Sequence, residues 1–175
     1  MPETPAASPS PDEIVAMLRN GSSDDWERFR LRDSSFPLGR SKLGVRWILM
    51  AVSCGSPECV CWCIEQGAEI DFVDESGATV LHACIERTDP PMKYDVLVEL
   101  IAAGADLDLI GYNGWAPLHV AAVRGDRQSA ALLLDAGADN QVRTTIDDRS
   151  TAAEEAFASG HDDLARFIRD YRCGS

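Results

Sequence analysis

The sequence is poor in positive charge and has no long apolar run. It contains 16 lysine and arginine residues against 29 aspartate and glutamate residues, which gives a formal net charge of −13. Nucleic-acid binding requires clustered basic side chains against phosphates, so this charge disfavours a nucleic-acid partner. No apolar run approaches the roughly 18 residues of a membrane span. The N-terminal stretch MPETPAASPSPDE also lacks the basic and apolar regions of a secretion signal. These absences predict a cytoplasmic protein with no membrane partner.

The cysteines do not form a recognisable metal motif. No C-x-x-C pair occurs, although the run CVCWC places three cysteines close together. If residues 56–66 are helical, Cys59 and Cys63 share one face and Cys61 points away, so the three cannot close one tetrahedral site. Free cysteine is often fully buried, and a chain without an export signal disfavours disulfides. We therefore expect no metal and buried free thiols; the six cysteines are Cys54, Cys59, Cys61, Cys63, Cys84 and Cys173.

Signatures of catalysis and nucleotide binding are also missing. Neither G-x-G-x-x-G nor G-x-x-x-x-G-K-[ST] occurs, so no nucleotide cofactor is expected. Acid-base or nucleophilic catalysis needs several groups that converge on one pocket. Neighbouring acids such as Glu154 and Glu155 are more typical of favourable charge at a helix start. The sequence predicts a protein that is not an enzyme, provided that its three histidines have structural roles.

The first 39 residues differ from the rest of the chain. Residues 1–10 are rich in proline, alanine and serine and are expected to be disordered. Order is expected to begin at Ser10, because Ser10 and Glu13 form an S-x-x-E capping box with a proline in the first turn. A second short helix is expected over 24–33. The sequence thus predicts an N-terminal helical cap over residues 11–39.

From residue 40 to residue 175 the chain repeats itself. Three segments share one register, and each is followed by a second helical stretch and a glycine-alanine-acid stop; the segments are GVRWILMA (44–51), GATVLHAC (77–84) and GWAPLHVA (114–121). The spacing is 33 residues from Gly44 to Gly77 and from Gly104 to Gly137, but 37 from Gly67 to Gly104. The extra residues fall in an insertion at 87–95. The predicted repeats are 40–72, 73–109, 110–142 and a degenerate copy at 143–172.

A period of 33 with T-P-L-H-x-A at its head and G-A-D at its tail resembles the ankyrin repeat. The resemblance implies an all-α solenoid, in which helix-turn-helix repeats stack and β-turns project from one side. It covers roughly residues 40–172, with terminal elements that cover the ends of the core. The small size and the arginine-rich, lysine-poor composition fit the small bacterial ankyrin proteins.

The resemblance also assigns the histidines. In the family, the threonine and histidine of T-P-L-H tie the turn at the start of the first helix, and Thr79 with His82 matches this pattern. His119 falls at the same position, although Ala116 replaces the threonine there. His161 matches the G-H pair before the second helix. All three histidines are thus expected to be structural.

Partner contacts in the family come from the variable positions around T-P-L-H and from two residues after the small-residue pair of the first helix. Tyr112 and Trp115 stand out, because large aromatic side chains on turn tips supply rigid contact area. Alternatively, Trp115 folds back onto the neighbouring turn. The predicted contact residues are Val73, Glu75, Ser76, Ala78, Glu86 and Arg87 in the second repeat, and Ile110, Tyr112, Asn113, Trp115, Val123 and Arg124 in the third.

These features predict a monomeric, non-catalytic protein-binding module, an adaptor or inhibitor that uses an acidic concave face with aromatic residues. Residues 41–140 hold 15 acids against 6 bases, and this charge favours a partner with a basic surface. The insertion at 87–95 is expected at the edge of that face. One alternative is an inhibitor of the four-repeat kinase-inhibitor type, which the enlarged second repeat disfavours. Another is a structural scaffold without a discrete partner.

Overall fold

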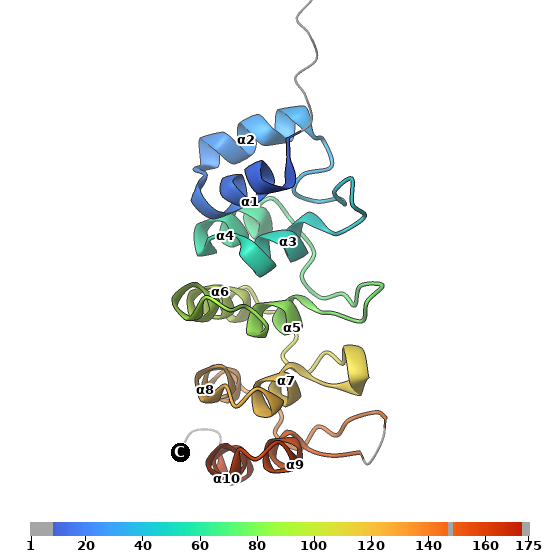
Figure 1. Ribbon diagram of the computed structural model, residues 1–175, viewed down its shortest axis with the longest axis vertical. Helices are drawn as coiled ribbons and strands as arrows, with labels where there is room; N and C mark the ends of the chain where they lie inside the picture. Colours follow the sequence, from blue (N-terminus) through green and yellow to red (C-terminus); the bar gives the residue numbers. More distant parts are fainter. Residues whose placement is uncertain (1–8, 147–148, 173–175) are drawn as a thin grey trace, which may run out of the picture.

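The computed structural model describes residues 9–146 and 149–172, which form a single row of stacked helix pairs (Figure 1). The helices are α1 (Pro11–Asn20), α2 (Ser23–Arg32), α3 (Trp47–Cys54), α4 (Pro57–Glu65), α5 (Val80–Ile85), α6 (Pro90–Ala102), α7 (Pro117–Val123), α8 (Arg127–Asp135), α9 (Ala152–Ala158) and α10 (Asp162–Asp170), with a short 3-10 helix, η1 (Tyr112–Gly114). Only isolated β-bridges occur within the described ranges. The predicted all-α solenoid of helix-turn-helix repeats is confirmed.

Each pair places one helix in an inner row and one in an outer row. The helices α1, α3, α5, α7 and α9 pack in succession along the inner row, and α2, α4, α6, α8 and α10 do so along the outer row. The segments that precede α3, α5, α7 and α9 all project to the same side of the stack, on the right in Figure 1. These projecting segments are the β-turns that the repeat pattern predicts.

The first two helices continue both rows. Ser10 caps α1 as expected: its hydroxyl accepts from the Glu13 backbone N–H at 3.2 Å, and the Glu13 carboxylate accepts from the Ser10 backbone N–H at 2.6 Å. The predicted disordered tail lies almost entirely outside the described residues. The division into a cap at 11–39 and four repeats stays a prediction.

An aromatic cluster joins the first two helices to the pair α3 and α4. The Phe36 ring lies 5.5 Å from the Trp62 ring in a stacked arrangement and meets the Phe29 and Trp47 rings edge to face at 5.2 and 5.3 Å. Trp26 packs on Trp62 at 5.7 Å. All five side chains are buried. Because aromatic pairs bury large areas and favour tilted geometries, this cluster packs the N-terminal end onto the core that continues through the stack.

The four extra residues of the second repeat lengthen its outer helix. Helix α6 spans 13 residues, whereas α4 and α8 span 9 each. Pro90 and Pro91 occupy the first turn of α6, where proline costs no hydrogen bond. The insertion at 87–95 is therefore mostly helical, and it lies at the α5–α6 connection.

Candidate protein-binding face

The three histidines connect neighbouring repeats. His82 Nδ1 lies 2.7 Å from the Thr79 hydroxyl, as the family pattern predicts, and its Nε2 lies 3.0 Å from the Trp115 carbonyl of the next repeat. His119 repeats the arrangement: its Nδ1 accepts from the Ala116 backbone N–H at 3.2 Å and its Nε2 lies 3.1 Å from the Ser150 carbonyl. In both rings Nδ1 acts as an acceptor and Nε2–H as the donor, which fits the neutral imidazole.

Burial lowers the pKa of both His82 and His119, which keeps them neutral. His161 lies at the end of the stack, and its Nε2 is 3.2 Å from the Val123 carbonyl. A Cβ on Gly125 would meet the His161 ring at 2.7 Å, and Gly125 has a φ of 67°, so glycine is required there. The prediction that the histidines have structural roles is confirmed, so His119 holds a turn and joins two repeats.

The first three projecting loops share one backbone. In the first, Ser41 N–H donates to the Val45 carbonyl at 2.8 Å and Gly44 N–H to the Ser41 carbonyl at 2.9 Å. The loop before α5 has the same two bonds between Asp74, Gly77 and Ala78, and Gly44 and Gly77 have φ values of 81° and 84°. The loop before α7 follows the same pattern from Gly111 to Trp115. The repeat therefore fixes the backbone of each loop but not the two side chains at its tip.

These loops touch one another and form a continuous surface. Arg40 pairs with Glu75 at 3.5 Å, the Tyr112 N–H donates to the Gly77 carbonyl at 2.6 Å, and the Thr145 N–H donates to the Gly114 carbonyl at 3.1 Å. We call this surface the hairpin ledge and define it as residues 40–46, 73–78, 110–115 and 144–146. Together with the exposed residues of the inner helices, it forms the candidate binding face.

The predicted contact residues divide into exposed and buried positions. Val73, Glu75, Ser76, Glu86, Asn113 and Arg124 are exposed, and Ala78, Ile110, Tyr112, Trp115 and Val123 are half-buried. The Ser76 hydroxyl donates to the Asp74 carboxylate at 2.7 Å, which shapes the loop tip. Burial raises the pKa of Asp74, but hydrogen bonds from Ser76 and Ala78 outweigh burial, and the pKa is lowered. Asn113 has a left-handed φ of 54°, which asparagine tolerates better than most residues.

Tyr112 and Trp115 are less exposed than the sequence suggested. The Tyr112 ring packs against the His82 ring at 4.9 Å and the Trp115 ring at 6.2 Å. The Tyr112 hydroxyl donates to the Glu86 carboxylate at 2.9 Å. Burial and this bond raise the pKa of Tyr112. Tyr112 thus packs on the preceding repeat, whereas the ring contact of Trp115 is with Tyr112 of its own turn; whether Trp115 folds back onto a neighbouring turn stays a prediction. Only part of each ring is available to a partner.

The prediction that Arg87 contacts a partner is wrong, because its side chain is buried inside the stack. Its Nη1 donates to the Val52 and Gly55 carbonyls at 2.7 and 3.0 Å, where α3 ends. Its Nε and Nη2 both donate to the Asp89 carboxylate at 2.9 Å, and this pairing lowers the pKa of Asp89. Asp89 also pairs with Arg19 of α1 at 2.6 Å. Arg87 therefore joins the first and second repeats instead of facing solvent.

A second buried ion pair follows from the insertion. Lys93 Nζ lies 2.6 Å from the Asp126 carboxylate, and both side chains are nearly inaccessible to solvent. Asp126 also caps α8, because it accepts from the Ser129 backbone N–H and hydroxyl at 3.0 and 2.8 Å. Burial raises the pKa of Asp126, but the bonds from Lys93 and Ser129 outweigh burial, and the pKa is lowered. The sequence placed Lys93 in a surface extension and did not reveal this link between repeats.

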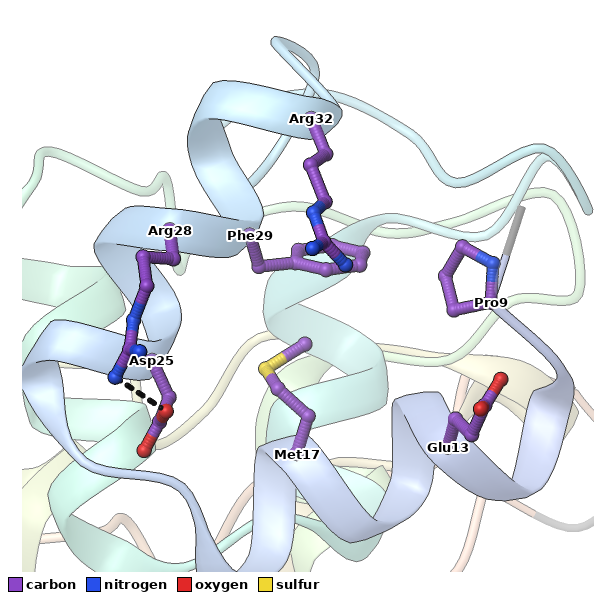
Figure 2. Close-up of a pocket in the computed structure, with 7 residues that line it drawn as sticks. All are labelled: Pro9, Glu13, Met17, Asp25, Arg28, Phe29 and Arg32. Atoms are coloured by element: carbon purple, nitrogen blue, oxygen red, sulfur yellow. Dashed lines mark hydrogen bonds and ion pairs between the residues drawn. The ribbon is translucent and has the colours of Figure 1, made fainter. Parts of the chain in front are cut away.

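A pocket of about 340 Å³ lies between α1 and α2, at the N-terminal end of the stack (Figure 2). Met17 and Phe29 give it an apolar floor, and Arg28 and Arg32 stand at its rim. Its two acids, Glu13 and Asp25, are both engaged in capping boxes, and the bonds from Ser10 and Ser22 lower their pKa values. Both carboxylates therefore stay ionised and cap helices, so neither is suited to general acid catalysis.

Cys59, Cys63 and Cys84 are buried free thiols, as the sequence predicts, whereas Cys54 and Cys61 are half-buried and Cys173 lies outside the described residues. Cys59 and Cys63 are free thiols joined by a hydrogen bond, and this hydrogen bond, with burial, raises the pKa of Cys59. Cys61 points toward Glu99 of α6, and burial together with this contact raises its pKa to about 12. Across residues 9–146 and 149–172, no three His, Cys, Asp or Glu side chains group closely enough to hold a metal. No helix in those ranges is long and apolar enough to cross a membrane.

Residues 48–144 match the family model of ankyrin repeats, which contains three copies. The chain belongs to the ankyrin-repeat family. This ankyrin-repeat protein is 37% identical over 100 residues to the nuclear factor NF-kappa-B p105 subunit of Gallus gallus. It is 36% identical over 110 residues to a putative E3 ubiquitin-protein ligase of Arabidopsis thaliana, and 34% identical over 99 residues to the RelA-associated inhibitor of Mus musculus.

The similarity covers only part of each relative. The matched regions make up 57%, 62% and 55% of this chain, but only 10%, 28% and 11% of the three relatives. The comparison therefore identifies the repeat array, and the activities of the whole relatives do not transfer with it.

Several features of the face escaped the sequence analysis. Among the described residues, five exposed aliphatic side chains lie on the hairpin ledge or directly before it: Leu38, Leu43, Val45, Val73 and Ile146. The alignment of Gly44 with Gly77 places Leu43 at a loop tip, so the register could have revealed its exposure. The aromatic cluster and the Lys93–Asp126 pair carry no comparable signal, because they depend on how separate elements pack.

Proposed function

We propose that this ankyrin-repeat protein is a non-catalytic protein-binding module that binds through the hairpin ledge and the exposed residues of its inner helices. Ankyrin repeats typically mediate protein–protein interaction, and the family membership supports this class of function. The observation that carries the proposal is the gathering of exposed aliphatic side chains on the ledge. Clustered apolar side chains on a surface otherwise rich in charge are typical of protein interaction sites.

The charge of repeats 2 to 4 supports a basic partner surface. Glu75 and Glu86 are exposed, Glu86 accepts from the Tyr112 hydroxyl, and acidic residues outnumber basic ones across the repeats. Complementary charge speeds association and selects against partners of the same sign. The revised contact set for repeats 2 and 3 keeps the predicted residues except Arg87, so it consists of Val73, Glu75, Ser76, Ala78, Glu86, Ile110, Tyr112, Asn113, Trp115, Val123 and Arg124.

The role of inhibitor or adaptor is the finer part of the proposal. One relative is named as an inhibitor, the RelA-associated inhibitor of mouse, and that name supports an inhibitor here. The kinase-inhibitor type remains an alternative that the enlarged second repeat disfavours, and a scaffold without a discrete partner is disfavoured by the exposed aliphatic residues. The cytoplasmic location, the monomeric state and the bacterial source stay predictions.

Charge reversal at one exposed glutamate tests the proposed face. The partner is first captured from the native source with the full chain, and its affinity is then measured by titration calorimetry. We expect Glu86→Lys to weaken binding by about tenfold, because close charge pairs at an interface contribute on the order of 1.5 kcal/mol or more. Its matched control is Glu65→Lys, which makes the same change on the outer helix α4.

Equal weakening by Glu86→Lys and Glu65→Lys would show that only net charge matters. Weakening by Glu65→Lys alone would move the site to the outer helices. Both results would overturn the proposed face. Thermal melts of the two variants serve as the control for folding, since both side chains are exposed.

A further inference from the structure

The last inner helix exposes a large apolar side chain at a position that each earlier repeat buries. Phe157 is the sixth residue after the N-cap of α9, and it is 68% exposed. The same position holds Val52 in α3, Ile85 in α5 and Ala122 in α7, and each of these is 0% exposed. A further inner helix packs against α3, α5 and α7, whereas α9 and α10 form the last pair of the described stack (Figure 1). Phe157 therefore lies on the flank through which the repeats stack.

A small residue lies one helical turn before this ring. Ala153 is the second residue after the N-cap of α9 and is half-buried. The larger residues at this position of α3, α5 and α7 are all buried: Ile48, Leu81 and Leu118. Because residues four apart share one face of a helix, Ala153 and Phe157 form a stripe with a small residue beside a large one. Such a stripe is complementary to itself, since two antiparallel copies can place each ring over the alanine of the other.

We propose that two copies of this chain associate through this flank, with α9 of one copy packed antiparallel on α9 of the other. A two-fold contact of this kind uses the same patch on both copies and closes after two chains. The flank is separate from the hairpin ledge, so the inference goes beyond the proposed function. The monomeric state that the sequence predicts would then hold only at low protein concentration.

The outer helix at this end limits what can cover the flank. Arg169 of α10 is exposed and pairs with Asp170 at 2.9 Å, whereas Leu134 at the equivalent position of α8 is 1% exposed. The outer row thus ends in charge, as terminal repeats of a stack usually do, while the inner row ends in Phe157. A partner that covers both rows would bury the Arg169 guanidinium at a cost. A contact centred on α9 leaves Arg169 at the rim, in water.

The charge of this end allows two copies of an acidic chain to meet. The whole chain carries −13, but residues 149–172 hold five acids and four bases. Exposed pairs between Asp163 and Arg166 and between Asp170 and Arg169 place both signs on α10. Because repulsion between exposed charges is screened beyond about 10 Å, the charge near the contact matters most. A basic partner would gain little here, so a second copy fits this end better.

Sedimentation equilibrium of the full chain tests the inference without knowledge of any other partner. The average mass should rise with protein concentration toward that of two chains. Phe157→Ser should raise the dissociation constant of the dimer by about tenfold or more, which is typical of the loss of an aromatic anchor. Its melting temperature should stay close to that of the wild type, because the side chain is mostly exposed.

The matched control removes an exposed apolar side chain at the other end of the stack. Leu31 of α2 is 85% exposed, and Leu31→Ser should leave the dissociation constant within about twofold (Figure 1). Equal losses from Phe157→Ser and Leu31→Ser, with species larger than two chains in the wild type, would indicate contact between opposite ends. Contacts of that kind do not close, and this result would overturn the two-fold arrangement.

Ala153→Leu distinguishes the proposed pairing from general apolar adhesion. The change adds apolar surface and gives α9 the leucine that α5 and α7 have at this position. We expect a weaker dimer, because the leucine fills the space that the ring of the other copy needs. A stronger dimer would overturn the antiparallel pairing of Phe157 with Ala153.

Three further results would contradict the inference. The first is a wild-type chain whose average mass stays that of one chain at every concentration. The second is a dimer that Phe157→Ser does not weaken. The third is loss of the captured partner in Phe157→Ser, which would make the flank part of the partner site. Because the dimer is measured without that partner, a failure here is distinct from a failure of the proposed function.

Discussion

Repeats 2 and 3 share a backbone pattern, yet the same residue type has opposite surroundings in them. Arg87 and Arg124 occupy equivalent positions after the inner helices α5 and α7. Arg87 is buried and donates to two carbonyls at the end of α3 and to Asp89, whereas Arg124 is exposed. The cause is local: repeat 2 continues into the insertion with Asp89, whereas repeat 3 turns at Gly125.

The comparison shows what a repeat position determines. It determines the backbone conformation, as the recurring left-handed glycines and the histidine–carbonyl bonds demonstrate. It does not determine the surroundings of a long side chain, because an insertion a few residues away changes which groups it can reach. Changes at equivalent positions of the two repeats therefore test this difference.

Removal of the guanidinium should affect the two repeats very differently. Arg87→Met should reduce the free energy of unfolding by about 2 to 4 kcal/mol, because it leaves two buried carbonyls and Asp89 without their donor. Arg124→Met, the matched control at the equivalent exposed position, should change it by about 0.5 kcal/mol or less. Urea denaturation followed by circular dichroism measures both values. Equal losses in the two variants would refute the distinction between the repeats.

Acid should destabilise the joints that His82 and His119 form between repeats. Burial lowers the pKa of both rings from 6.5, so the two histidines become protonated at a higher pH in the unfolded chain than in the folded chain. Stability should therefore fall as the pH drops below about 6.5 toward the folded pKa values, by at most about 1.4 kcal/mol per pH unit for each histidine. Denaturation midpoints at pH 7 and 5.5 test this, and His119→Gln should reduce the slope. An unchanged slope would exclude His119 as a source of the effect.

The cap of the inner helix offers a way to make repeat 3 resemble repeat 2. Thr79 caps α5 through its side chain, whereas Ala116 provides no side-chain cap to α7. Ala116→Thr should raise the free energy of unfolding by about 1 kcal/mol, because threonine is favoured over alanine at this position. Both positions are buried to the same degree, with 1% exposure, so the same side chain is expected to fit. A destabilised variant would show that the two turns are not equivalent.

The smallest effect is expected from the tyrosine hydroxyl on the ledge. Tyr112→Phe removes the bond to Glu86 but keeps the ring on His82, so stability should change by about 0.5 kcal/mol or less. Thermal melts provide the measurement. A loss above about 1.5 kcal/mol would mean that the bond between Tyr112 and Glu86, and not the ring, holds the ledge together.

The sequence predicted the features that recur and missed those that do not. The register of Gly44 and Gly77, the link between Thr79 and His82, and the capping box at Ser10 all rest on short-range patterns, and each is present. The burial of Arg87 depends on carbonyls more than 30 residues away, at Val52 and Gly55. Such contacts leave no periodic signal, because they follow from the packing of whole elements.

The partial burial of the ledge aromatics was also missed. The sequence marks Tyr112 and Trp115 as unusual at turn positions, but it does not show that the His82 ring lies beneath Tyr112. The exposed Leu43 was missed for the opposite reason: an aliphatic residue in a repetitive region looks like part of the core until its loop position is known. Sequence reasoning thus placed these residues in the projecting loops but misjudged which of their side chains are exposed.

Hydrogen exchange on the complex with the captured partner tests the central claim, that the protein binds through its hairpin ledge. Amides at exposed loop tips exchange readily in the free protein, so their protection by a partner is easily detected. We expect slower exchange at residues 40–46, 73–78 and 110–115 and unchanged exchange in α4, α6 and α8. Protection confined to those outer helices, with unchanged exchange in the loops, would contradict it.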